Sequence, residues 1–173
     1  MRHWASPATA IGAAVLISSS GSASPQQGPV SGSYILDRER SDNVFRAINS
    51  AVAGLSGAAR PPFVNRLRKA AAPAYAIRIS IAAGRLSIKN DAKTPIVVWT
   101  GGEPIEWKLE DGQVFDVSAK ANSEAISLTF RGADSERTTV YRSDGQQLLT
   151  ETTIVSPLLS TPLRYKIVYN RAN

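Results

Sequence analysis

Histidine, cysteine and methionine are almost absent from this sequence of 173 residues. There is no cysteine, and the single histidine and single methionine are His3 and Met1, at the amino terminus. Zinc, copper, haem and iron–sulfur sites depend on these ligands, and catalytic triads and Cys–His pairs need the same side chains. We therefore expect no metal site, no cofactor and no catalytic residues of these kinds. The lack of cysteine also excludes disulfides and the lipid-modified cysteine of a bacterial lipoprotein.

The sequence also lacks an apolar run of roughly 20 residues, which is the length that a transmembrane helix needs. The nearest candidate lies at the start, where Arg2 and His3 precede an apolar centre at 8–17 and a small-residue tail that ends at Ala23. This order is typical of a secretory signal peptide. We expect residues 1–23 to be cleaved near Ala23, leaving a periplasmic or secreted protein with no integral membrane segment. The content of alanine and arginine favours a bacterial source.

The rest of the chain has the composition of a short leader and one domain. Residues 24–31 are rich in Ser, Pro, Gln and Gly, which predicts a flexible leader. Residues 32–173 are enough for a single domain with a sizeable core. The net charge of +6 is moderate and favours solubility, with attraction to anionic surfaces as the alternative. Nucleic-acid binding is not expected, because no basic groove with interleaved aromatic residues appears.

From Tyr75 to Tyr169 the sequence is a series of short apolar or alternating segments separated by turn residues. Strict alternation predicts strands with one buried face. Asp111-Gly112 and Ser143-Asp144-Gly145 are hairpin signals. The nine predicted strands are 77–81, 85–89, 96–99, 105–110, 115–119, 126–130, 138–142, 148–155 and 163–170. A further strand is predicted at 32–37.

Between the first strand and this meander the apolar spacing becomes helical. Apolar residues from Val44 to Leu55 lie on one helical face, with Phe45 beside them, and Ser41 or Asp42 is the expected N-cap. A second helix is predicted from Phe63 to about Ala72, after two prolines and before a third. Its basic residues, Arg60, Arg66, Arg68 and Lys69, are typical of a solvated helix face.

The predicted architecture is mainly β: a strand, a helical pair at about 41–72, and nine more strands. A meander of nine or ten antiparallel strands must close into a β-barrel or β-clam to bury its apolar face and protect its edges. A helical pair inserted after the first strand is well placed to cover an open end of that barrel.

This arrangement resembles the calycin superfamily, and within it the β-clam of the fatty-acid-binding-protein type, which has a helix-turn-helix between its first two strands. Lipocalins of the same superfamily carry Gly-x-Trp near the first strand, with a basic residue packed over the aromatic ring. Here Gly32-Ser33-Tyr34 stands at the matching place, with Tyr for Trp. Arg171 is the candidate for the basic residue, and Arg164 is the alternative.

The resemblance implies an internal cavity for a fatty acid or a similar amphipathic molecule. In fatty-acid-binding proteins, Arg and Tyr side chains near the C-terminal strands hold the ligand carboxylate, as Arg suits a carboxylate through two parallel hydrogen bonds. The matching residues implied here are Arg131, Tyr141, Arg142, Tyr165 and Tyr169. The alternative places these tyrosines in the core and the arginines in solvent, because strands alternate apolar-in and charged-out.

Aromatic residues complete the predicted ligand-binding set. Trp99 and Trp107 flank the Gly101-Gly102 turn and either line a mouth or anchor the core. Phe45 and Phe63 come from the helical pair.

Carboxylates are the remaining candidates for catalysis, since paired carboxylates hydrolyse glycosides. They crowd one region, at Glu103, Glu106, Glu110, Asp111 and Asp116. Alternation places Glu106 and Glu110 on the outward face and Asp111 in a turn, so we expect no enzymatic activity.

The sequence thus predicts an exported, non-enzymatic binding protein that holds a small apolar or lipid-like ligand inside a calycin-like barrel. The alternative is a structural or protein-interaction module of the cell envelope with a solid core and no ligand. Its surface, at the basic helices or the 157–162 loop, would meet an envelope protein partner. An internal cavity favours the first, and a filled interior with an exposed apolar patch favours the second.

Overall fold

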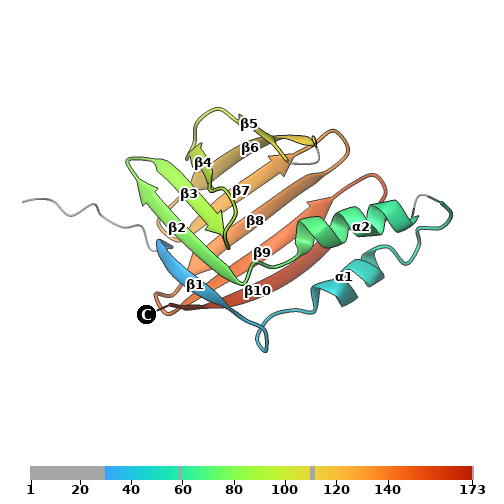
Figure 1. Ribbon diagram of the computed structural model, residues 1–173, viewed down its shortest axis with the longest axis horizontal. Helices are drawn as coiled ribbons and strands as arrows, with labels where there is room; N and C mark the ends of the chain where they lie inside the picture. The colour runs from blue at the N-terminus through green and yellow to red at the C-terminus, as the bar shows by residue number, and fades with distance from the viewer. Residues whose placement is uncertain (1–29, 59, 110–111, 173) are drawn as a thin grey trace, which may run out of the picture.

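The computed structural model describes residues 30–58, 60–109 and 112–172, so the predicted signal peptide lies outside the described residues. Ten strands form one antiparallel sheet in the order β4-β3-β2-β1-β10-β9-β8-β7-β6-β5 (Figure 1). The elements are β1 (Gly32–Asp37), α1 (Val44–Ala51), α2 (Arg60–Ala71), β2 (Ala76–Ala82), β3 (Arg85–Asn90), β4 (Ile96–Trp99), β5 (Ile105–Lys108), β6 (Val114–Ala121), β7 (Ala125–Arg131), β8 (Glu136–Ser143), β9 (Gln147–Val155) and β10 (Leu163–Arg171). The predicted mainly-β meander with a helical pair after its first strand is confirmed.

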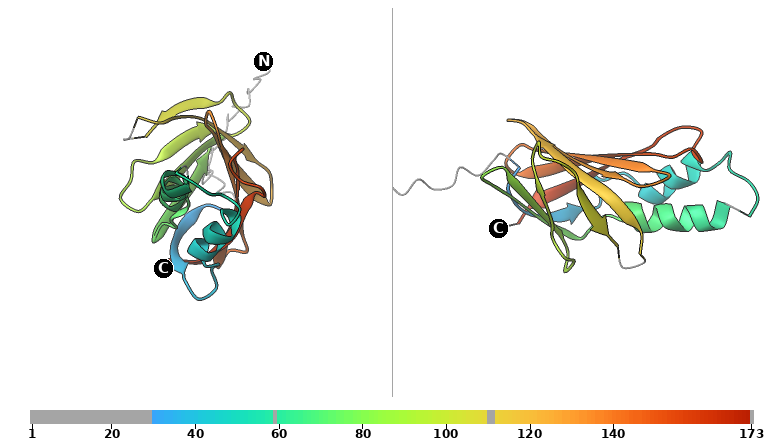
Figure 2. Two further views of the ribbon diagram at one scale, coloured as in Figure 1. Left: turned by 90° about the vertical axis from the view of Figure 1, so that its right-hand side faces the viewer. Right: turned by 90° about the horizontal axis from the view of Figure 1, so that it is seen from above.

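The sheet curls into a nearly closed barrel (Figures 1 and 2). β1 pairs with both β2 and β10, which joins the first and last strands of the chain. β4 and β5 end the strand order at opposite edges. Across the gap between them, Thr100 forms a parallel bridge with Ala119 of β6, and the Gly101 amide donates to the Ala119 carbonyl at 2.8 Å. This bridge reduces the exposed edge that an open sheet would present.

Alternation along each strand decides which side chains enter the barrel. In β9, Leu148, Thr150, Thr152 and Ile154 are buried, while the residues between them face outward. The same pattern in the other strands builds a single apolar core that also includes the buried faces of both helices. The core therefore follows from the local alternation of the sequence together with the strand register.

The seam between β1 and β10 contains the predicted Gly-x-Tyr motif. Tyr34 lies opposite Arg171 in the register and is fully buried. The Arg171 guanidinium carbon lies 5.8 Å from the centre of the Tyr34 ring, so Arg171 and not Arg164 covers the aromatic ring. The Tyr34 hydroxyl donates to the carbonyl of Val30, which is buried together with Ser31 although both fall at the end of the predicted leader. We call this end of the barrel the seam end.

Helix α1 begins later than predicted. Its N-cap is Asn43, whose side-chain oxygen accepts from the Arg46 amide at 3.0 Å, so the prediction of Ser41 or Asp42 is wrong. The reason is tertiary: Ser41 accepts from the Val168 amide of β10, and the Asp42 carboxylate accepts from the Lys166 amide. These two side chains bind the connecting segment to β10 and leave the capping role to the next residue.

Helix α2 begins at Arg60, so both prolines lie in its first turn, where a missing amide costs nothing. Phe63, Leu67 and Ala71 form its buried face. Both helices lie at the same end of the barrel (Figure 2), where β9 finishes and β10 begins. We call this the helical end. No helix in the described part of the chain is long and apolar enough to cross a membrane.

Candidate functional site

A stripe of hydroxyl groups crosses the inner face of β8, β9 and β10. Thr139 lies opposite Thr152, which lies opposite Tyr165 on the next strand. The hydroxyl oxygens of Thr139 and Thr152 are 3.0 Å apart. One step toward the seam end, the buried Thr150 donates to the Ile167 carbonyl at 3.3 Å. These strands therefore place polar groups inside an otherwise apolar barrel.

Three of the predicted site residues, Tyr141, Tyr165 and Tyr169, are buried on this inner face. Burial raises the pKa of Tyr141 to about 12, with a smaller opposing influence from the Arg137 charge. Burial likewise raises the pKa of Tyr165 and of Tyr169. All three phenols are consequently neutral at physiological pH, and a neutral phenol can donate a hydrogen bond.

Arg137 is an inner-face residue that the sequence analysis missed. It begins the inward alternation of β8 that continues through Thr139 and Tyr141. Its Nη1 donates to the carbonyl of Ala70 in α2 at 2.7 Å, and its guanidinium carbon lies 4.3 Å from the centre of the Phe130 ring. Arg137 thus connects the inner face of the barrel to the helix above it.

The signal for Arg137 was present in the sequence. The strand was predicted to begin at Thr138, two residues after the observed start at Glu136, which left Arg137 outside it. Extending the alternation back by one residue places Arg137 on the same face as Tyr141. No local pattern, however, indicates that α2 lies above this position.

The two arginines predicted to hold a carboxylate lie on the other face of the sheet. Arg131 forms an ion pair with Glu136 at 2.9 Å, and Arg142 forms one with Glu151. Both pairs are on the outer, exposed side of the barrel. The structure therefore does not bring Arg131 or Arg142 together with the three tyrosines.

Of the four aromatic residues predicted to bind the ligand, two pack against the core and two are exposed at the surface. Phe63 lies on the buried face of α2, and Trp107 packs half-buried against the core. Trp99 is 55% exposed and Phe45 is 59% exposed. Only Phe63 and Trp107 thus belong to the lining of the barrel.

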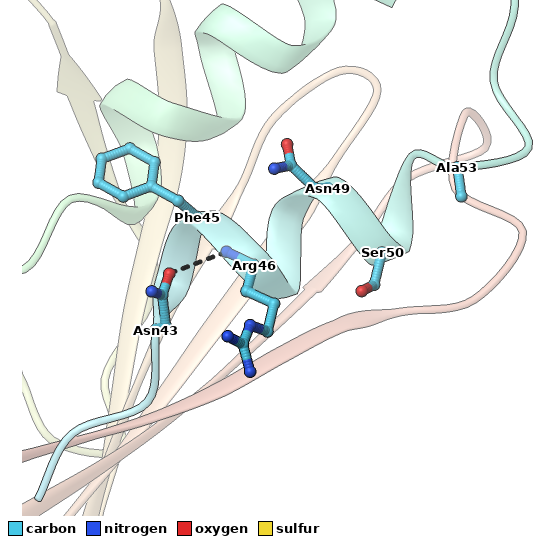
Figure 3. A pocket seen from close by; sticks show the side chains of 6 residues that line it. All are labelled: Asn43, Phe45, Arg46, Asn49, Ser50 and Ala53. Atoms are coloured by element: carbon cyan, nitrogen blue, oxygen red, sulfur yellow. Dashed lines mark hydrogen bonds between the residues drawn. The ribbon is translucent and has the colours of Figure 1, made fainter.

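Two surface hollows lie outside the barrel. The first, of about 560 Å³, borders α1 and is shown with the Asn43 cap in Figure 3. Its lining residues are Asn43, Phe45, Arg46, Asn49, Ser50 and Ala53. The second, of about 410 Å³, is formed largely by outward side chains of β8, β9 and β10 beside Asp42. Both hollows are open to solvent and lie mainly outside the apolar core.

The carboxylates considered for catalysis do not converge in the described ranges. Glu106 of β5 lies opposite Asp116 of β6, and both are exposed on the outer face. Glu103 is exposed in the preceding turn, while Glu110 and Asp111 lie outside the described residues. Among residues 30–58, 60–109 and 112–172, no group of three or more His, Cys, Asp or Glu side chains could hold a metal ion.

No family model and no curated protein matches this sequence. Solved structures do match it. A Schistosoma mansoni fatty acid binding protein in complex with arachidonic acid has 14% identity and a TM-score of 0.55, over 84% of this chain and 97% of that chain. Human cRBP IV has 18% identity and a TM-score of 0.55, over 83% and 98%.

A secretory abundant heat soluble protein from Ramazzottius varieornatus has 10% identity and a TM-score of 0.59, over 84% of this chain and 96% of that chain. These identities are low, so the likeness concerns the fold. It covers the barrel and the helical pair together. The chain has the calycin-like β-barrel fold of the fatty-acid-binding-protein type.

Proposed function

We propose that the protein binds a small apolar or amphipathic, lipid-like molecule inside the barrel, without chemical change to it. The observation that carries this proposal is the inner face of β8–β10, where threonine hydroxyls and neutral tyrosines interrupt an apolar lining. A few placed polar groups in an apolar enclosure are typical of small-molecule sites. The structurally similar Schistosoma mansoni protein holds arachidonic acid, which supports a ligand of this class.

The helical end is the proposed entrance. In addition to its apolar packing, α2 makes two polar contacts with the β7–β8 hairpin. These are the Arg66–Asp134 ion pair at 3.2 Å and the hydrogen bond from Arg137 to the Ala70 carbonyl. The ion pair is exposed on both sides, and such pairs contribute only about 0–1 kcal/mol. A displacement of α2 therefore breaks two polar contacts with this hairpin in addition to the apolar packing of Phe63, Leu67 and Ala71, and it would open a path to the stripe of hydroxyl groups.

Export is part of the proposal. The apolar segment at 8–17 and the small residues before Ala23 support a cleaved signal peptide, and hence a periplasmic or secreted location. Mass spectrometry of the protein recovered from the envelope or medium tests this. A chain that begins near Ser24 supports export, and an uncleaved chain in the cytoplasm contradicts it.

Native mass spectrometry tests the binding function itself. The protein is purified without detergent, and its mass is compared under native and denaturing conditions. We expect a bound species in the lipid mass range that is released on denaturation. A bare protein mass, together with no uptake of added fatty acid or fatty alcohol, would count against binding.

A second candidate function, an interaction module of the cell envelope, is favoured by a different observation. The inward side chains of β9 and β10 are almost all buried, and both surface hollows lie outside the barrel. α1 and α2 carry basic residues and no acidic ones, and Phe45 is exposed among them. Cross-linking in the envelope, with Phe45→Ser as the variant, tests this candidate: a partner lost in that variant favours it.

A further inference from the structure

Strand β5 has one free edge. It ends the strand order beside β6 (Figure 1), and no other strand in the described part of the chain pairs with it. Just after β5, the Leu109 amide donates to the Gln113 carbonyl at 2.8 Å. Hydrogen-bonded residues alternate along an antiparallel pair, so the backbone groups of Trp107 also face β6. Those of Glu106 and Lys108 therefore point to the free edge.

The side chains of Glu106 and Lys108 carry opposite charges that are not paired within a single chain. Both are exposed on the outer face, and neither forms an ion pair among the described residues. Glu106 lies opposite Asp116 of β6, and like charges directly opposite each other destabilise a sheet. Lys108 lies opposite the exposed Val114. A cation beside Glu106 and an anion beside Lys108 would therefore stabilise this edge.

The free edge is complementary to itself. When a second copy of β5 runs antiparallel with Trp107 on the two-fold axis, Glu106 of each copy lies opposite Lys108 of the other. The backbone groups of both residues point to the free edge, so each such pair can exchange two hydrogen bonds. On the inner side Trp107 meets Trp107, and Ile105 meets the exposed Leu109. Every facing pair is thus opposite in charge or apolar on both sides.

Neighbouring registers lack this match. A shift by two residues places Glu106 opposite Glu106, or Lys108 opposite Lys108, so that like charges face each other. A shift by one residue pairs Glu106 or Lys108 with a residue whose backbone groups already bond to β6. Charge and backbone hydrogen bonding therefore select the same single register.

We propose that the free edge of β5 pairs with the same edge of a second copy of this chain, which gives a two-fold symmetric dimer. Charged residues on an edge strand usually discourage pairing. Here Glu106 and Lys108 discourage the wrong registers and favour one antiparallel copy. A two-fold interface is closed, so it does not propagate into a fibre. The inference concerns a surface and does not depend on the proposed ligand binding.

We expect the dimer to be weak and sensitive to salt. β5 has four residues, so the interface is smaller than that of a stable complex. Glu106 and Lys108 are exposed, so salt screens their attraction. Sedimentation velocity at low ionic strength, with protein concentrations up to about 1 mM, measures association in this range.

The test reverses the two charges. Glu106→Lys and Lys108→Glu each turn two attractive pairs into repulsive ones, and each should weaken association by about tenfold or more. The double variant with both substitutions restores opposite charges, so its dissociation constant should return to within about threefold of wild type. Lys166→Glu is the matched control, because Lys166 is an exposed lysine of β10, which four other strands separate from β5. It should leave association within about threefold of wild type.

A mixture of the two single variants tests the register directly. One variant then presents two lysines along its edge and the other presents two glutamates, so both charged pairs of the mixed dimer are opposite in sign. We expect the mixture to associate about tenfold or more tightly than either variant alone.

Three results would overturn the proposal. A wild-type protein that stays monomeric at every concentration would leave the edge to a strand of another protein. Dimers that ignore both single reversals would place the interface on a different surface. A mixture that associates no better than its components would exclude the pairing of Glu106 with Lys108.

Discussion

The guanidinium of Arg171 lies over the ring of Tyr34, with 5.8 Å between the guanidinium carbon and the ring centre. The two residues are also register partners in the pairing of the first and last strands. The contact therefore supports the pairing of β1 with β10, which joins the first and last strands of the barrel. It is a structural role that the Gly-x-Tyr motif predicted.

Removal of Arg171 should destabilise the protein. We expect Arg171→Ala to lower the free energy of unfolding by about 1–3 kcal/mol, because it removes a cation–π contact and two hydrogen bonds to carbonyl groups. Urea denaturation measures this change. The exposed Arg164 is the control, and Arg164→Ala should change stability by less than about 0.5 kcal/mol. Equal effects of the two substitutions would contradict the closing role of Arg171.

The buried tyrosines should make stability fall at alkaline pH. Their raised pKa means that the folded protein keeps the phenolic protons that the unfolded chain releases. Their contribution is therefore fully present below the ordinary tyrosine pKa of 10.0, and is lost as the pH rises through about 12, the value for Tyr141. Urea denaturation at neutral pH and at several alkaline values measures the loss.

The control for this prediction is Tyr141→Phe, which should make the alkaline decline shallower. Tyrosinate absorbance of the folded protein gives an independent reading. Titration of all tyrosines at their ordinary pKa in the folded protein would contradict the burial of Tyr141, Tyr165 and Tyr169.

Inner-face and outer-face residues should affect ligand affinity differently. We expect Tyr165→Phe to weaken the binding of a fatty acid by about 2–10-fold, because it removes one hydroxyl from the inner stripe. Arg142→Ala should leave the affinity unchanged, since Arg142 forms an ion pair with Glu151 on the outer face. Competition with a fluorescent lipid measures both. A loss of affinity in Arg142→Ala alone would place the ligand outside the barrel.

The strands were predictable because their signals are local. Each of the nine predicted strands after Tyr75 corresponds to one strand from β2 to β10, and the alternation correctly separates Tyr165 from Arg164. Side-chain alternation and turn residues depend on immediate neighbours in the chain. These two signals were sufficient for the strand number and for the barrel architecture.

Features that depend on contacts between distant segments were harder to predict from the sequence. The cap of α1 shifted to Asn43 because Ser41 and Asp42 bind β10, more than a hundred residues away in the sequence. Likewise, the contact of Arg137 with Ala70 depends on where α2 lies above the barrel. Periodicity indicates which face a side chain occupies but does not show what packs against that face.

The candidate site was predicted only in part. Tyr141, Tyr165 and Tyr169 do share the inner face, as their spacing along β8 and β10 indicates. Arg142 directly follows Tyr141, so alternation alone places it on the opposite face. The residue types implied by the resemblance were found inside the barrel, but the inner arginine at the helical end is Arg137.

The measurement that tests binding inside the barrel most directly is a residue-resolved NMR titration of the isotopically labelled protein with a long-chain fatty acid. We predict that the largest shifts occur at the inward residues Leu128, Tyr165 and Ile167, with little change at the outer Arg131 and Arg142. Shifts confined to Phe45 and the hollow beside α1, or no shifts at all, would contradict an internal site.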